Sequence, residues 1–179
     1  ANSLGYMYEF GLGISKNIIE AINWYKTSAE DGNRDGQLSL GIVYLNGTGL
    51  EKDYKKALKW IFVSSENGNN RATYVLGKMY REGKGVSKDY EKAYRLFKNA
   101  ADNGSSEAQV DLGYAYESGQ GISSDIKRAI RYYRLAAEQG NQFAQYNLGN
   151  MYRLGRGISK DFQKAAKWYR LAANQGNAK

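Results

Sequence analysis

The chain has 179 residues, of which 42% are hydrophobic, and a formal net charge of +8. It contains no cysteine and no histidine, which excludes disulfides, Ser/His and Cys/His nucleophile systems and the usual zinc sites. No apolar run approaches the roughly 18 residues of a membrane-spanning helix. The positive charge raises the question of an acidic partner.

Glycines recur at a constant interval along the whole chain. One set is Gly5, Gly41, Gly77, Gly113 and Gly149, with 36 residues from each to the next, and three further sets keep the same step. Such a period without a slip predicts a stacked repeat array. We divide residues 1–179, as one solenoid domain, into units 1–33, 34–69, 70–105, 106–141 and 142–177. Ala178 and Lys179 look like the opening of a sixth unit.

The first half of each unit predicts an amphipathic helix. In the fifth unit, Ala144, Leu148, Met151 and Tyr152 have the spacing of one helical face, which predicts a helix over about 142–154. The Gly155-x-Gly157 pair ends this helix, because glycine readily takes the left-handed conformation. A glycine inside the helix, such as Gly149, costs about 1 kcal/mol relative to alanine. Its recurrence predicts that a second helix crosses there at close range.

The second half of each unit predicts another helix, with an acidic residue as its N-cap. The caps are Asp53, Asp89, Asp125 and Asp161, while Asn17 takes the position in the first unit, where Glu20 suggests a capping box. The fifth unit then carries an apolar stripe of mixed sizes, Phe162, Ala165, Trp168, Tyr169, Ala172 and Ala173. Small alanines let neighbouring helices approach and aromatic rings fill the remaining space. Gly176 and Asn177 close the helix.

Along the chain the units vary only mildly. The second helix has Trp24 and Tyr25 in the first unit and Trp60 in the second, where Ser64 and Ser65 loosen the alanine pattern. In the third unit Leu96 replaces the tryptophan and Phe97 follows it, and in the fourth unit Tyr132 and Tyr133 occupy these positions.

This pattern closely resembles the Sel-one-like repeat (SLR) family over essentially the whole chain. The fifth-unit residues that carry the resemblance are Ala144, Leu148, Gly149, Tyr152, Gly155, Gly157, Asp161, Ala165, Trp168, Tyr169, Ala172 and Ala173. The resemblance implies an all-α, α/α superhelical solenoid of about five helix-turn-helix repeats, similar to tetratricopeptide repeats. It also implies a protein–protein interaction scaffold without catalytic residues, cofactor or metal. SLR proteins are common in bacteria and include periplasmic and secreted ones, which slightly favours such a location over a cytoplasmic one.

By analogy with tetratricopeptide repeats, variable positions around the recurring leucine of the first helix should line a concave groove. These positions give the candidate partner-binding residues Tyr6, Tyr74, Lys78, Arg81, Tyr114, Glu117, Tyr146, Asn150 and Arg153. They change from unit to unit, and tyrosine and arginine are enriched at binding hot spots. We expect a protein or peptide partner with acidic groups. The alternative is that Tyr74 and Tyr146 pack between neighbouring first helices.

Basic residues form two columns on the second helices. One column is Lys56, Lys92, Arg128 and Lys164, and the other is Lys59, Arg95, Arg131 and Lys167. Along a convex side they could bind nucleic acid or an anionic surface, or they could simply keep the array soluble. We favour solubility, because lysine at this position is ordinary in SLR units. The glycine-rich segment 77–85 has the wrong spacing for a phosphate loop, so we expect no nucleotide cofactor.

The last helix does not look like a cap. Repeat arrays that end naturally shield their terminal helices with a polar outer face, yet Trp168, Tyr169 and the paired alanines match the interior units. We therefore expect the chain to be a segment of a longer protein and its end faces to favour end-to-end self-association.

Overall fold

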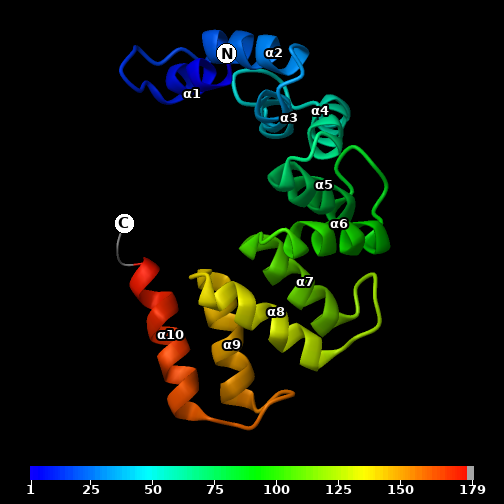
Figure 1. Cartoon of the computed structure of the whole chain (residues 1–179), viewed down its shortest axis with the longest axis vertical. Helices are drawn as coiled ribbons and strands as arrows, with labels where there is room; N and C mark the ends of the chain where they lie inside the picture. Colours follow the sequence, from blue (N-terminus) through cyan, green and yellow to red (C-terminus); the bar gives the residue numbers. More distant parts are fainter. Residues whose placement is uncertain (177–179) are drawn as a thin grey trace. The chain divides into compact units, whose positions relative to one another are not determined.

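The computed structural model describes residues 1–176, which form ten α-helices and no strand. Each repeat contributes two helices (Figure 1). Their bounds are α1 Asn2–Phe10, α2 Ile18–Glu30, α3 Arg34–Asn46, α4 Tyr54–Glu66, α5 Asn70–Glu82, α6 Tyr90–Asp102, α7 Ser106–Ser118, α8 Ile126–Glu138, α9 Gln142–Leu154 and α10 Phe162–Gly176. The predicted all-α solenoid is confirmed. The expected closure at Asn177 and the opening of a sixth unit at 178–179 lie outside the described residues.

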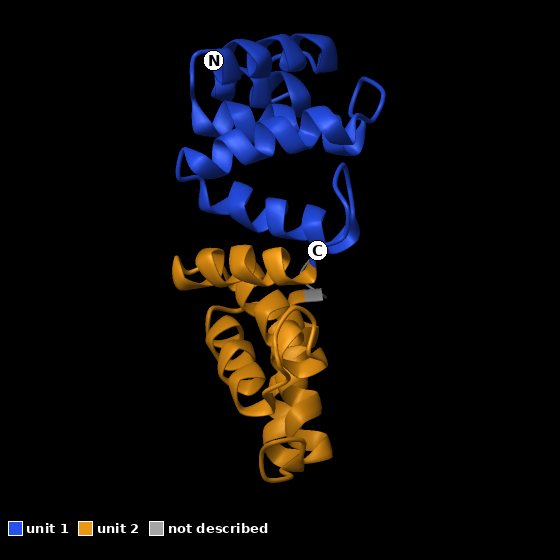
Figure 2. Cartoon of the chain, turned by 90° about the vertical axis from the view of Figure 1, so that its right-hand side faces the viewer, with its two compact units in different colours: residues 1–89 blue, residues 90–179 orange. Residues whose placement is uncertain are grey.

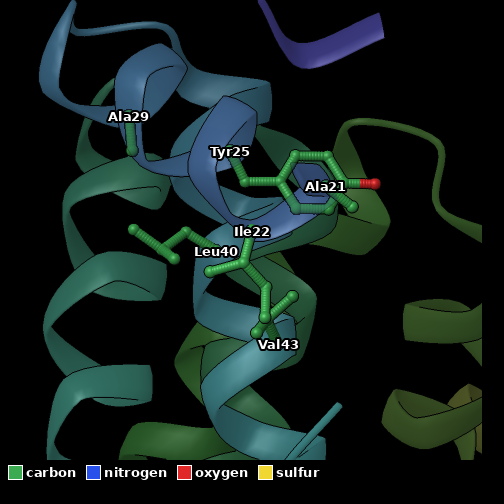
Figure 3. Packing of buried hydrophobic residues seen from close by; sticks show 6 residues of the cluster. All are labelled: Ala21, Ile22, Tyr25, Ala29, Leu40 and Val43. Carbon is green, nitrogen blue, oxygen red and sulfur yellow. The ribbon is translucent and has the colours of Figure 1, made fainter. Parts of the chain in front are cut away.

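The chain divides into two compact units, each built from consecutive helices (Figure 2). Unit 1 covers residues 1–89 with α1 to α5, and unit 2 covers residues 90–179 with α6 to α10. Within each unit, every helix packs against the helix that follows it in sequence. In unit 1 the buried core around Tyr25 includes Ala21, Ile22, Ala29, Leu40 and Val43, from α2 and α3 (Figure 3). In unit 1 this cluster therefore fills the space between successive helices.

The turn between the two helices of a repeat has the same construction in all five copies. Glycine ends the first helix in the left-handed conformation, as at Gly155 with φ 68°, and Gly157 follows with φ 71°. The backbone N–H of the residue that caps the second helix then donates to a tyrosine carbonyl of the first helix. These bonds join Asn17 to Tyr8, Asp53 to Tyr44, Asp89 to Tyr80, Asp125 to Tyr116 and Asp161 to Tyr152, at 2.8 to 3.0 Å.

The predicted side-chain caps are confirmed at four of the five second helices. Asn17 accepts from the Ile19 and Glu20 amides, each at 3.1 Å. The aspartates Asp53, Asp125 and Asp161 each accept from the amide three residues on, at 2.9, 3.0 and 2.9 Å. The amide donors hold the pKa of Asp53 and Asp161 below the usual value. The capping box at Glu20 is wrong, because the Asn17 N–H that it needs already donates to Tyr8.

The close crossing at the first-helix glycine is confirmed in four of the five repeats, and the structure shows what fills it. A Cβ on Gly113 would lie 2.7 Å from the ring of Tyr133, and one on Gly149 would lie 2.7 Å from the ring of Tyr169. The first repeat pairs Gly5 with Tyr25 in the same way, while Gly41 of the second faces Ile61 at 2.5 Å. Real Cβ atoms essentially never sit this close to other atoms, so glycine is required by packing.

Buried glutamines join one repeat to the next, a feature that the sequence analysis did not predict. Gln37 in α3 donates to the Ala29 carbonyl of α2 at 3.4 Å and accepts from the Asn67 amide after α4 at 2.9 Å. Each glutamine thus satisfies polar groups from two second helices. The same arrangement recurs with Gln109 between Ala101 and Gln139, and with Gln145 between Ala137 and Gln175.

We predict that the recurring leucine contributes more to stability inside the array than near its start. Leu112 is fully buried, whereas Leu4 is only half-buried. Leu112→Ala should therefore lower the free energy of unfolding by about 2–5 kcal/mol, and Leu4→Ala by clearly less. Urea melts of the two variants compare the losses, and equal losses would contradict nearest-neighbour energetics.

We also predict that Gly113→Ala is destabilising despite the better helix propensity of alanine. The added Cβ would clash with the Tyr133 ring, and overpacking costs about 1–3 kcal/mol. In a Tyr133→Leu background the same substitution should cost nothing or stabilise the helix by up to about 1 kcal/mol. Thermal or urea melts of the four proteins measure this coupling. An equal cost in both backgrounds would show that the ring is not the obstacle.

Candidate partner-binding site

Two adjoining pockets lie on the face of unit 1 that its first helices α1, α3 and α5 form. The first, of about 170 Å³, lies against α1 and α3 and includes Tyr6 and Phe10. The second, of about 280 Å³, lies against α3 and α5 and includes Val75 and Lys78. Both pockets are lined by Ile42, Asn46 and Arg71, so they lie side by side. We call these two pockets the unit 1 groove.

The acidic side chains of the groove are already held by neighbours. Glu9 in the first pocket accepts a 2.6 Å hydrogen bond from the Tyr25 hydroxyl, and burial together with this carboxylate raises the pKa of Tyr25. Glu82 in the second pocket pairs with Lys84 at 2.7 Å. Arg71 differs from both, because its exposed side chain makes no hydrogen bond or ion pair within residues 1–176. Among the described residues that line the groove, Arg71 is therefore a cation that is free to bind a partner.

The predicted residues of unit 1 are divided between the groove and its surroundings. Tyr6 lines the first pocket, 52% exposed, with its ring centroid 4.6 Å from that of Phe10. Lys78 lines the second pocket, and its Nζ lies 5.7 Å from the centroid of the Tyr74 ring. Tyr74 itself is half-buried and is not among the lining residues. Arg81 lies beside Glu82, at 3.8 Å, and is also outside the lining.

In unit 2, three predicted residues surround the hydroxyls of second-helix tyrosines. Glu117 accepts a 2.7 Å hydrogen bond from Tyr133 and forms an ion pair with Arg156. Asn150 accepts from the Tyr169 hydroxyl at 2.7 Å, and Arg153 donates to the same hydroxyl at 3.2 Å. These first-helix side chains therefore form hydrogen bonds with the hydroxyls of packed tyrosine rings.

The other two predicted residues of unit 2 are exposed aromatic rings on the first helices. Tyr114 in α7 is 46% exposed and Tyr146 in α9 is 55% exposed. The Tyr146 ring lies against Tyr169, with 5.7 Å between centroids. Exposed tyrosines of this kind offer a large apolar contact area and a hydroxyl for hydrogen bonding.

The basic column on the second helices is engaged within its own repeat. Lys56 pairs with the cap Asp53 at 3.3 Å, and its Nζ lies 5.4 Å from the centroid of the Tyr44 ring. The same two partners recur for Arg128, with Asp125 and Tyr116, and for Lys164, with Asp161 and Tyr152. In the other column Arg95 pairs with Glu91 at 2.5 Å. Much of this positive charge is therefore matched locally.

Sequence reasoning missed Arg71, although a signal for it was present. Arg71 lies five residues before the recurring leucine, and this position reads Asp35, Arg71, Glu107 and Phe143 in successive repeats. It changes in every repeat, which is the property that marked the other candidates. Ile42 was also missed, although it lies two residues after the recurring leucine, where other candidates were selected. An isolated isoleucine is typical of a core position.

Within residues 1–176, no helix has the length and apolar character that crossing a bilayer requires. The same residues contain no cluster of three or more His, Cys, Asp and Glu side chains suited to a metal ion.

The chain matches the Sel1 repeat family model five times, at residues 1–33, 34–69, 70–105, 106–141 and 142–177. A comparison with curated proteins found no match.

Solved structures show the same similarity. The Sel1 repeat protein from Oxalobacter formigenes is 37% identical with a TM-score of 0.92, over 98% of this chain and 70% of that chain. The protein c5321, a protective antigen present in uropathogenic Escherichia coli strains, is 34% identical with a TM-score of 0.85, over 98% of this chain and 38% of that chain. The immunity protein PA5088 from Pseudomonas aeruginosa is 25% identical with a TM-score of 0.69, over 98% and 65%.

This chain therefore spans under two thirds of the length of c5321 and of PA5088. Five successive family matches and two structures above 30% identity agree on one assignment. The chain belongs to the Sel1 repeat family, whose members are generally non-catalytic protein-interaction scaffolds.

Proposed function

We propose that this chain is a non-catalytic scaffold that binds a protein or peptide partner through the first helices of its repeats. The observation that carries the proposal is the unit 1 groove. Its lining residues differ between repeats, whereas the packing residues of the scaffold recur. Tyr6, Ile42 and Lys78 occupy one equivalent position in three successive repeats, and all three line the groove. Variation at a position that packing does not constrain is what partner selection requires.

The size of the pockets favours a polypeptide over a small molecule. Small-molecule sites usually have volumes of about 300–1,000 Å³ and enclose most of the ligand. The two pockets have only about 170 and 280 Å³. Each suits a single side chain of a segment that continues from one pocket into the other.

Unit 2 contributes exposed aromatic rings on the corresponding helices. Tyr114 and Tyr146 are about half exposed, and tyrosine is among the residues that dominate binding energy at interfaces. We therefore propose that the first helices of unit 2 also contact the partner.

Binding of nucleic acid or an anionic surface to the second helices has less support. Lys56, Arg128 and Lys164 already pair with aspartate caps and lie near tyrosine rings. A surface that tracks phosphates would lose affinity by orders of magnitude between about 50 and 200 mM salt. We expect no such loss for the partner of this chain.

Site-specific photo-crosslinking tests the proposed face. A photoreactive benzoylphenylalanine replaces Tyr6 or Tyr114 on the first helices or, as controls, the exposed Lys55 of α4 or Lys127 of α8. After irradiation in an extract of the source cells, mass spectrometry identifies the adducts. We expect the same protein to crosslink from Tyr6 and Tyr114 but from neither control position.

A second variant separates this result from binding by the basic columns. Lys56→Glu with Lys164→Glu should leave the crosslinking yield from Tyr6 unchanged. Adducts formed only from Lys55 and Lys127, or a yield abolished by this charge reversal, would contradict the proposed face.

A further inference from the structure

We propose that the unit 1 groove binds an extended segment of a partner protein in which an acidic side chain lies between two apolar side chains, with Arg71 receiving the carboxylate. This inference rests on the proposed function and specifies the chemistry of the partner. It follows from the position of Arg71, from the engagement of the other charged groups and from the apolar lining of each pocket.

Arg71 borders both pockets, so a ligand that fills both would lie beside it. It is the second residue of α5 and lines both pockets, together with Ile42 and Asn46. Its side chain is exposed and makes no hydrogen bond or ion pair with another residue in the part of the chain that the structure describes. A guanidinium offers planar paired donors that match a carboxylate. Arg71 can therefore bind an acid without first breaking an internal contact.

The remaining charged side chains make the two pockets electrostatically different. Glu9 lines only the first pocket and is held by the Tyr25 hydroxyl, while Lys78 lines only the second. Lys84 in the second pocket pairs with Glu82, so that charge is balanced. An acidic group beside Arg71 is thus repelled from the first pocket and attracted toward the second. Complementarity of this kind selects partners and rejects those of the wrong charge.

The apolar lining accounts for the flanking side chains. In the first pocket the rings of Tyr6 and Phe10 lie 4.6 Å apart, centroid to centroid, beside Ile42. The second pocket has Leu45, Val75 and Met79 beside Ile42. Each surface gains free energy by burying an apolar side chain of the partner. On an extended chain every second side chain lies on the same face, with about 6.6 Å between such neighbours, so the acid should lie two residues from each apolar side chain.

A selection experiment tests this pattern on the complete chain. A phage-displayed library of random peptides is panned against the immobilised protein, and the strongest binder is synthesised with a fluorescent label. We expect enriched sequences to place Asp or Glu two positions from an apolar residue on each side. Changing that acid to its amide should weaken binding by about tenfold or more, because hydrogen bonds to charged groups are worth about 1.5–3 kcal/mol.

Variants of the protein then assign the effect to Arg71. Arg71→Gln should weaken the acidic peptide by the same factor and leave the affinity of the amide peptide unchanged. The matched control Lys55→Gln, an exposed cation of α4, should change neither affinity. Ile42→Asn should weaken both peptides by about tenfold or more. A urea melt checks that this variant stays folded, because the Tyr169 hydroxyl that Asn150 contacts in the fifth repeat is replaced here by Ile61.

The outcomes distinguish the acidic segment from the use of the groove as a binding site. If the selected peptides lack an acid, or lose no affinity with Arg71→Gln, the acidic segment is wrong while the groove remains a binding site. If they bind the Ile42→Asn variant as tightly as the natural protein, they bind elsewhere, and this assignment fails together with the proposed use of the groove. A selection that enriches no peptide would overturn both.

Discussion

The structure depends on the contact between a first-helix glycine and the second-helix side chain that lies on it. Because Gly113 has no Cβ, the ring of Tyr133 can lie against the helix backbone. This contact brings the tyrosine hydroxyl across the first helix to Glu117, four residues after the glycine. A packing requirement at the centre of the repeat therefore decides where a polar group is needed on the first helix.

In the second repeat both the residue over the glycine and the residue on the first helix are different, and they differ together. There the residue over Gly41 is Ile61, which has no hydroxyl. The position equivalent to Glu9 and Glu117 is Leu45, whose side chain lines the second pocket of the unit 1 groove. An apolar core residue thus accompanies an apolar groove residue. The buried glutamines act differently: they satisfy backbone groups between repeats and leave the outer positions of the first helices open to variation.

The fold could be predicted almost completely, because periodicity, glycine and cap residues act locally. The helix expected at 142–154 is α9, Gln142–Leu154, and the cap at Asp161 has its predicted bond. The candidate site was predicted only in part. Tyr6 and Lys78 line the groove, whereas Tyr74 and Arg81 do not. Contacts such as that between Glu117 and Tyr133 join residues 16 apart and depend on how two helices cross, which periodicity alone does not specify.

The link between Tyr133 and Glu117 also bears on how such arrays can be recombined. If α7 replaced α3 in the second repeat, its glutamate would face Ile61 and find no hydroxyl to bind. In the reverse exchange, Tyr133 would face a leucine and its buried hydroxyl would lose its acceptor, at a cost of about 1–3 kcal/mol. Whole repeats carry both members of the pair, so shuffling them avoids this mismatch. The smallest interchangeable module of the chain is therefore the helix pair rather than the single helix.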